Sequence, residues 1–397
     1  MKIQKKSIAD SWNDSLQLNY GTPELLFTKG KGAWLYDSSG EKYLDFLAGI
    51  ATNALGHAHP TIVSAVTAQI KRLSHISNLY MHEGALELSG LLKKLTGDQT
   101  TRTFFCNSGA EANEAAFKIA RLTGRKQIIA TIGGFHGRTA ASLSMTGQPA
   151  KQKPFLPLVP GIKHVAYGDL KALRKVVSRK TAMVILEPIQ GENGVVVPPD
   201  GYLAGARALC DAFGVLLCID AVQTGIGRTG EWFGYEHSGI KPDIITLAKG
   251  LGGGLPLGAM LTLGENVPSF APGDHGSTFG GNPVSIAASL AVLNEIKKSK
   301  LMAAARKSEV LIKRALSDHP LVTEVRGRGL LLGVVLTEPL AKTLAKECQK
   351  NHLLVNAPND SVIRFAPPLI ITDDEIEKFI KILTKSLSGL SQQKAGD

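Results

Sequence analysis

The sequence predicts an α/β fold, with a large domain on a mostly parallel sheet and a second, smaller α+β domain. Its 397 residues are enough for two or three domains of roughly 150 residues each. Short runs of β-branched residues alternate with amphipathic stretches through the middle of the chain. Continuous apolar strands joined by helical crossovers are typical of a parallel sheet that is covered on both faces.

The middle of the chain supplies the elements of the large domain. Seven apolar runs are predicted strands, at 101–106, 127–132, 164–166, 182–187, 215–220, 244–247 and 258–263. Helical periodicity marks 111–122 and 202–213 between these strands. The proline-rich stretch 148–161 is expected to be a long surface loop.

A change of pattern after residue 283 predicts the second domain. One long helical pattern covers 283–317, and it leads to predicted strands at 324–336 and 362–366. A Thr-Asp-Asp sequence predicts the start of a final helix at 372–387. We therefore expect a large domain at 56–305 and a small domain at 306–397. The N-terminal segment 1–55 is expected to join the small domain.

Charge and composition exclude several classes of protein. The net charge is +11, but no run of five basic residues occurs, and lysines and arginines are interleaved with acids. This distribution favours an enzyme that attracts anionic substrates, and a nucleic-acid-binding protein is the most distant alternative. The apolar stretches are far shorter than the roughly 20 residues that a membrane-spanning helix needs, so no membrane partner is expected.

The cysteines and the first residues predict a cytoplasmic protein. The four cysteines lie far apart or eight residues apart, which is typical of reduced thiols rather than of disulfides or a zinc site. The first 14 residues contain no apolar segment and no arginine, so we expect neither a secretory signal nor a mitochondrial presequence. His57 and His59 share a short turn without further ligands nearby in sequence, and no metal is expected.

The first stretch that carries chemistry is CNSGAEANEAAFKIARLTG, at 106–124. Ser108 and Glu111 form a capping-box pattern directly after a predicted strand. Gly109 at the turn lets backbone N–H groups approach an anion, and the helix dipole favours negative charge there. The pattern indicates an anion site, although a plain helix start would show the same residues.

Asp220 ends an apolar run of five residues. A carboxylate at that depth costs several kcal/mol unless a positive group pairs with it. The stretch that follows, GIGRTG at 225–230, has the glycine spacing of a dinucleotide fingerprint and suggests a dehydrogenase as an alternative. We reject it because the first glycine lies several residues beyond the strand end, and no acidic strand end follows about twenty residues later.

Lys249 ends the next apolar strand and precedes a glycine-rich loop. A lysine in a low-dielectric site loses its proton more readily and becomes a nucleophile that can form a Schiff base. The segment EPIQGENG at 187–194 also runs from a strand end into a polar loop, where ligands of parallel sheets bind. The anion-binding turn, Asp220 and Lys249 together specify a site for pyridoxal 5'-phosphate (PLP), which needs a phosphate cradle, a carboxylate at its ring nitrogen and a lysine for its aldehyde.

These motifs resemble those of class III aminotransferases of fold type I, over nearly the whole chain. The matching segments are YGTPELLFTKGKG, YLDFLAGIATNALGHAHP, SNLY, NSGAEANEAAFK, GGFHGRT, EPIQGE, DAVQTGIGRTG, AKGLGGGLPLGA, HGSTFGGNP, RGRGLLLG and IRFAPPL. The resemblance implies a seven-stranded sheet, PLP as cofactor and a homodimer with shared active sites. It is strongest to members that transfer the δ-amino group of N2-acetyl-L-ornithine to 2-oxoglutarate in arginine biosynthesis. Members that act on ornithine, 4-aminobutyrate or N-succinyl-diaminopimelate are the alternatives.

The resemblance also implies a role for individual residues. Lys249 is the implied Schiff-base lysine and proton shuttle, and Asp220 the partner of the pyridine nitrogen. The other implied cofactor contacts are Gly109 and Ala110 at the phosphate, Gln223 at the ring oxygen, Val222 and Phe135 on the two ring faces, and Thr278 at the phosphate of the neighbouring subunit. The implied substrate contacts are Arg138 at the distal carboxylate, Arg364 at the proximal carboxylate, Glu192 as the carboxylate that neutralises Arg364, Ser277 and Tyr20.

Two positions depart from the pattern of the family. Ala110 stands where many relatives have threonine, which removes a hydroxyl from the phosphate site. Ala221 stands where the family usually has glutamate, which removes a carboxylate beside the cofactor. The implied ring contacts on either side are intact, so we expect cofactor binding to survive and the level of activity or the substrate preference to change.

Overall fold

The central sheet contains all seven strands that the sequence predicts. The computed structural model describes residues 7–396, with side chains as far as 391, so the prediction for residues 1–6 lies outside the described residues. The strand order across the sheet is β4 (Arg102–Cys106), β10 (Gly258–Thr262), β9 (Ile244–Leu247), β8 (Leu216–Asp220), β7 (Thr181–Leu186), β5 (Gln127–Thr131) and β6 (Ile162–Val165). Only β10 runs antiparallel to its neighbours among these strands, and the predicted α/β class is confirmed.

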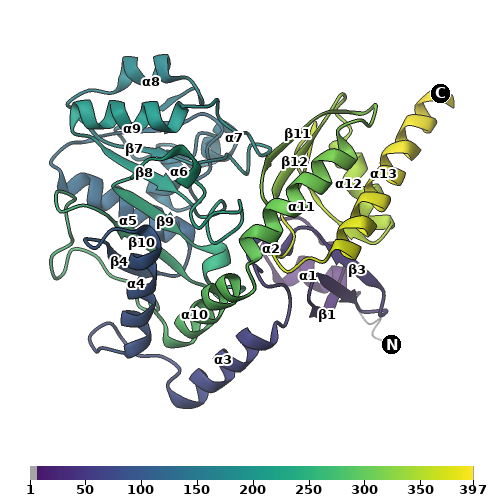
Figure 1. Cartoon of the computed structure of the whole chain (residues 1–397), viewed down its shortest axis with the longest axis horizontal. Helices are drawn as coiled ribbons and strands as arrows, with labels where there is room; N and C mark the ends of the chain where they lie inside the picture. Colours follow the sequence, from purple (N-terminus) through teal and green to yellow (C-terminus); the bar gives the residue numbers. More distant parts are fainter. Residues whose placement is uncertain (1–6, 397) are drawn as a thin grey trace.

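Helices cover both faces of this sheet because successive strand residues point to opposite sides. Ile128, Met183 and Cys218 pack on one face with α5 (Gly109–Leu122). Val184 and Leu217 pack on the other face with α9 (Tyr202–Phe213). The other helices of this body include α4 (Glu83–Thr96), α6 (Ala140–Met145), α8 (Leu170–Val176), η2 (Glu236–Ser238) and η3 (Lys249–Leu251). Figure 1 shows this body apart from a smaller one that holds both ends of the described chain.

Two expectations about helices differ from the structure. The stretch 283–317 is not one helix but two, α10 (Pro283–Lys298) and α11 (Leu301–Leu316). They separate at Lys300, whose φ of 52° is left-handed and ends the α-helical path. The break lets α10 pack on α3 (Pro60–Arg72), whereas α11 packs on the last helix of the chain. The expected loop 148–161 also contains two short helical turns, α7 (Pro149–Gln152) and η1 (Lys153–Phe155).

The small domain is built on an antiparallel sheet. Its order is β11 (Val322–Arg328), β12 (Leu331–Leu336), β15 (Val362–Phe365) and β14 (Asn356–Asn359), so the predicted strand region 324–336 is a hairpin. Gly329 makes the hairpin turn possible with a φ of 55°. Helices α12 (Ala341–Lys350) and α13 (Asp373–Gly396) pack against each other. Helix α13 starts where the sequence predicts, and Thr372 and Glu375 form a capping box there, with hydrogen bonds of 3.2 and 3.0 Å.

The N-terminal segment is attached to this small domain. It contains α1 (Ile8–Ser15), β1 (Phe27–Lys31), β2 (Trp34–Asp37), β3 (Lys42–Asp45) and α2 (Ala48–Ala51). Strand β3 pairs in parallel with β13 (Leu353–Leu354), and Trp34 Nε1 donates a hydrogen bond of 2.6 Å to Glu375. The expected domain boundaries at 55 and 305 stay predictions. Among the described residues, we find no helix with the length and apolarity that crossing a membrane requires.

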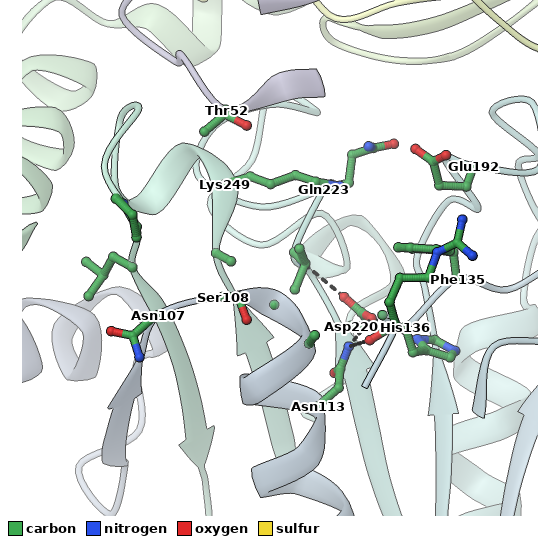
Figure 2. A pocket seen from close by; sticks show the side chains of 18 of the residues that line it. Thr52, Asn107, Ser108, Asn113, Phe135, His136, Glu192, Asp220, Gln223 and Lys249 are labelled. Carbon is green, nitrogen blue, oxygen red and sulfur yellow. Dashed lines mark hydrogen bonds and ion pairs between the residues drawn. The ribbon is translucent and has the colours of Figure 1, made fainter. Parts of the chain in front are cut away.

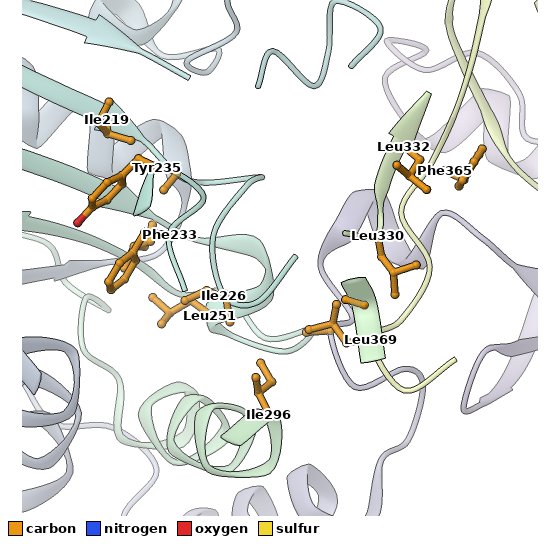
Figure 3. Packing of buried hydrophobic residues seen from close by; sticks show 14 of the residues in the cluster. Ile219, Ile226, Phe233, Tyr235, Leu251, Ile296, Leu330, Leu332, Phe365 and Leu369 are labelled. Atoms are coloured by element: carbon orange, nitrogen blue, oxygen red, sulfur yellow. The ribbon is translucent and has the colours of Figure 1, made fainter. Parts of the chain in front are cut away.

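The GIGRTG stretch connects the two bodies of the molecule through Arg228. Arg228 is buried, and its Nη1 donates to the backbone carbonyls of Leu330, at 3.2 Å, and Pro367. Burial lowers the pKa of Arg228 to about 9. Figure 3 shows the apolar cluster around this contact, which runs from Ile219 in the central sheet to Leu369 beside the small domain.

Arg228→Ala should therefore lower the free energy of unfolding. The change leaves two buried carbonyls without their donor, and each such loss costs about 1–3 kcal/mol. Urea unfolding at neutral pH would measure the effect, with Arg314→Ala as a control because Arg314 is exposed on α11. Equal unfolding midpoints for the two variants would show that Arg228 does not hold the two bodies together.

Candidate active site

A cavity of about 440 Å³ opens at the carboxyl end of the parallel strands. Strand β8 delivers Asp220 to it, and Lys249 enters from the turn that follows β9. Figure 2 shows side chains around this cavity that come from strand ends, from the N-terminal half of α5 and, for Thr52, from the N-terminal segment. Of the predicted cofactor contacts all but Thr278 line it, namely Gly109, Ala110, Phe135, Asp220, Val222, Gln223 and Lys249.

Asp220 is held by three hydrogen bonds although it is only 3% exposed. Its Oδ2 accepts from Asn113 Nδ2 and from His136 Nδ1, both at 2.8 Å, and its Oδ1 accepts from the backbone N–H of Val222 at 3.0 Å. Hydrogen bonds to the ionised form offset the cost of burying a carboxylate. The site thus holds a buried, hydrogen-bonded carboxyl group at the end of β8, as the sequence predicts.

Asn113 and His136 were not found by sequence reasoning. Both lie in motifs that resemble the family, NSGAEANEAAFK and GGFHGRT, so the motifs themselves were the available signal. Burial acts to lower the pKa of His136, but the hydrogen bond and charge of Asp220 and the charge of Glu187 outweigh it, so the pKa is raised. Within the described residues, His136 Nε2 and Asn113 Oδ1 have no hydrogen-bond partner.

Lys249 has a strained backbone conformation and a lowered pKa. Its φ is 45°, in the left-handed region that a non-glycine residue rarely adopts. Burial lowers the pKa of Lys249, and the charge of Arg364 adds to the effect, whereas Glu192 and Asp220 oppose it. A larger fraction of neutral amine is therefore present near neutral pH than for a lysine in water.

Helix α5 begins at Gly109, where the sequence predicts an anion site, and its capping differs from the prediction in one respect. Ser108 Oγ accepts from the N–H of Glu111 at 3.2 Å, which is half of the predicted capping box. Glu111 does not return a bond to Ser108 and instead accepts from the N–H and side chain of Asn107, both at 2.9 Å. A Cβ on Gly109 would lie 2.7 Å from Val222, so this turn needs glycine.

Glu187 fixes the backbone of Phe135 and is a second residue that sequence reasoning missed. Its Oε2 accepts from the N–H of Phe135 at 2.9 Å. Burial raises the pKa of Glu187 to about 7, with the charge of Asp220 adding to the shift. Its signal was its place in EPIQGE, where only Glu192 received a role.

Arg364 and Glu192 form the ion pair that the resemblance implies. Arg364 is 2% exposed, and its Nη1 donates to Glu192 Oε1 at 2.5 Å. Its guanidinium also donates to Asn356, at 2.8 Å, and to Gln223, at 3.4 Å. Burial acts to raise the pKa of Glu192, but the charges of Arg364 and Lys249 outweigh it, so the pKa is lowered.

Of the four remaining predicted residues, only Arg138 lines the cavity, and Ser277, Thr278 and Tyr20 do not. Arg138 lines it and is exposed at its mouth. Ser277 is connected to it through Asn107, whose Nδ2 donates to Ser277 Oγ at 2.9 Å. Thr278 is exposed and Tyr20 is 94% exposed, and neither lines the cavity of this chain, so their roles stay predictions.

The residues present fit PLP. Gly109 and Ala110 offer backbone donors at a helix start, which suits a phosphate group. The side chains of Phe135 and Val222 line the same cavity as the carboxylate of Asp220 and the amine of Lys249. This donor set matches a group that carries a phosphate, an aromatic ring with a basic nitrogen and an aldehyde.

The fold and the site define an aminotransferase of the class that in general depends on PLP. A family model described as aminotransferase class-III matches residues 17–387. The chain therefore belongs to the class III aminotransferases.

Named relatives cover the whole chain. The chain is 52% identical to an acetylornithine aminotransferase from Streptomyces coelicolor, over 100% of this chain and 99% of the relative. It is 53% identical to an acetylornithine aminotransferase from Mycobacterium tuberculosis, over 94% of each.

Solved structures with the same fold have different names. An ornithine aminotransferase from Toxoplasma gondii has a TM-score of 0.92 and 32% identity, over 97% of this chain and 95% of that one. An N-acetylornithine aminotransferase from Stenotrophomonas maltophilia has a TM-score of 0.82 and 33% identity, over 95% and 99%. The fold is thus common to enzymes named for two amino donors, and the choice between donors must come from side chains.

Proposed function

We propose that this chain transfers the δ-amino group of N2-acetyl-L-ornithine to 2-oxoglutarate, with PLP as cofactor. The products are N-acetyl-L-glutamate 5-semialdehyde and L-glutamate, a step of arginine biosynthesis. The relatives at about 50% identity over the whole chain bear the name of this activity. Ornithine, 4-aminobutyrate and N-succinyl-diaminopimelate are the alternative donors.

The observation that carries the proposal is the pair of Arg364 and Glu192 beside Lys249. Acetylornithine reacts at its δ-carbon, so its carboxylate lies far from the reacting atom and the groups near the reacting carbon are uncharged. Glutamate reacts at its α-carbon, so a carboxylate lies close to the reacting atom. Arg364 is neutralised by Glu192 at 2.5 Å for the first substrate, and it binds the carboxylate of the second when Glu192 moves away.

The chain's own residues divide the chemistry of each half-reaction. When bound, PLP supplies an electron sink for the carbanion formed at the substrate carbon. Asp220, which Asn113 and His136 hold in place, would favour a protonated ring nitrogen. Lys249, with its lowered pKa, takes and returns a proton beside the reacting carbon. Phe135 and Val222, which line the same cavity, would hold the ring of the cofactor in place.

Arg364→Ala should slow the half-reaction with glutamate about a hundredfold and the half-reaction with acetylornithine much less. Truncating one partner of a buried charge pair costs about 2–5 kcal/mol, and here the loss falls on the substrate whose near carboxylate needs the cation. Single-turnover absorbance changes would measure each half-reaction separately. Arg138→Ala is the matched comparison and should slow both halves, because both substrates have a distal carboxylate. Equal losses in both halves for Arg364→Ala would contradict the division.

Two simple measurements separate the proposal from its alternatives. The purified protein should be yellow, and an amino donor or borohydride should discharge the colour, which would not happen with a dinucleotide-dependent dehydrogenase. Comparing rates with acetylornithine, ornithine, 4-aminobutyrate and N-succinyl-diaminopimelate would then identify the donor. A clear preference for another donor would overturn the assignment to acetylornithine.

We also propose that the enzyme works as a cytoplasmic homodimer with shared active sites. The segments 78–82 and 277–281 lie together, since Asn78 donates to the carbonyl of Gly280 at 2.9 Å. They expose Leu79, Met81 and Phe279 beside the exposed Thr278, which supports a second copy covering this face. The four buried, unpaired cysteines fit a reducing compartment.

A further inference from the structure

Lys151 is a second cation beside Phe135, a residue that lines the cavity, and the proposed reaction does not use it. Its Nζ lies 5.9 Å from the ring centroid of Phe135, and the guanidinium carbon of Arg138 lies 5.8 Å from the same centroid. Lys151 is half-buried on α7, and its ammonium donates to the side chain of Gln148. Gln148 is itself held by a hydrogen bond of 3.0 Å to the carbonyl of Gly133, so the lysine is positioned rather than free.

Neither of these two cations has an anionic partner within the part of the chain that the structure describes. The acid that acts on Lys151 is Glu192, but Glu192 is bonded to Arg364. Burial lowers the pKa of Lys151, the charge of Arg138 lowers it further, and Glu192 opposes both. Two like charges next to one ring repel each other, and an anion bound between them would remove that cost.

The candidate amino donors differ in net charge at their α-carbon end, which is the end expected beside Lys151 and Arg138. In acetylornithine the α-nitrogen is a neutral amide, so the α-carboxylate gives that end a charge of −1. In ornithine the α-ammonium cancels the carboxylate, and the same end has no net charge. A site with two cations therefore attracts the first and gains little from the second.

We propose that Lys151, together with Arg138, selects amino donors whose α-nitrogen is acylated. The pair attracts the α-carboxylate and repels a free α-ammonium, so it acts on specificity and not on the chemistry at Lys249. The inference deepens the proposed function and rests on it. It also implies that an acyl group with its own carboxylate, such as a succinyl group, is accepted at this end.

Lys151→Met tests the proposal because it removes the charge and keeps most of the side-chain volume. The kcat/KM for acetylornithine should fall about tenfold, or ~1.4 kcal/mol, while that for ornithine changes less than about twofold. Lys151→Arg should restore the selectivity. Lys153→Met is the matched control, because it removes the same net charge from an exposed lysine two residues further along.

A binding measurement separates selection from catalysis. N2-acetyl-L-norvaline has the distal end of acetylornithine without its δ-amino group, so it binds without being transaminated. Calorimetry should show about tenfold weaker binding to Lys151→Met than to the wild type, and added salt should reduce the difference.

The outcomes distinguish this inference from the proposed function. A wild type that prefers acetylornithine, with the same ratio of acetylornithine to ornithine in Lys151→Met, overturns the role of Lys151 alone. An equal loss in Lys153→Met also overturns it, because general charge would then be the cause. A wild type that prefers ornithine overturns both proposals.

Discussion

Replacing Lys249 with alanine should abolish transamination and leave the cofactor held only by non-covalent contacts. A methyl group cannot form the covalent bond to an aldehyde, and it cannot carry a proton to or from the substrate carbon. No other lysine lines the cavity in the described part of the chain. The phosphate cradle and Asp220 are unchanged, so the variant should still bind PLP, with a shifted absorbance maximum.

Borohydride reduction followed by peptide mapping tests this assignment directly. In the wild type the reduced cofactor should be found on the peptide that contains Lys249, and in Lys249→Ala no peptide should carry it. Lys151→Ala is a useful control, because Lys151 is the lysine next to Phe135 and should not affect the labelling. Cofactor found on Lys151, or on any lysine other than Lys249, would contradict the assignment.

The sequence was sufficient for the central strands of the large sheet because they are buried on both faces. Every residue of β7 and β9 is buried, so both appear in the sequence as mostly apolar runs without a charged residue. The division between α10 and α11 was not predictable in this way. Lys300 takes the left-handed conformation without a glycine or proline to signal it, and the apolar period continues on both sides.

The same distinction holds at the site. Asp220 and Lys249 could be predicted because a charged residue directly after an apolar strand has few explanations other than function. The sequence did not predict roles for Asn113, His136 and Glu187, because each of them forms its hydrogen bond with a residue that is distant in sequence. His136 meets Asp220 across 84 positions and Asn113 meets it across 107, and only the fold brings them together.

Tyr20 is a residue whose predicted role the structure of one chain does not test. Its predicted substrate contact rested on resemblance alone, without a local pattern to support it. In this chain the side chain is almost fully exposed and away from the cavity. Only a neighbouring subunit or a movement of the N-terminal segment could bring it to a substrate.

Asp220→Asn should keep the fold but reduce turnover about a hundredfold or more. The amide has the shape of the carboxylate and can still accept the hydrogen bond from Val222, but it has no charge to favour a protonated ring nitrogen. Losing one partner of a buried ion pair costs about 3–5 kcal/mol. His136 should respond as well, because the charge that raises its pKa is gone and burial then lowers it.

A matched variant separates this role from a structural one. Asp243 is also paired, since it accepts from Arg207 at 2.6 Å and from the N–H of Leu217 at 2.7 Å, but it does not line the cavity. Asp243→Asn should lower stability in thermal unfolding and leave turnover nearly unchanged, whereas Asp220→Asn should do the reverse. Titration of the His136 ring by NMR gives a second readout, with a lower pKa expected in Asp220→Asn. Near-normal turnover in that variant would refute the role of Asp220 at the ring nitrogen, since its negative charge is what the substitution removes.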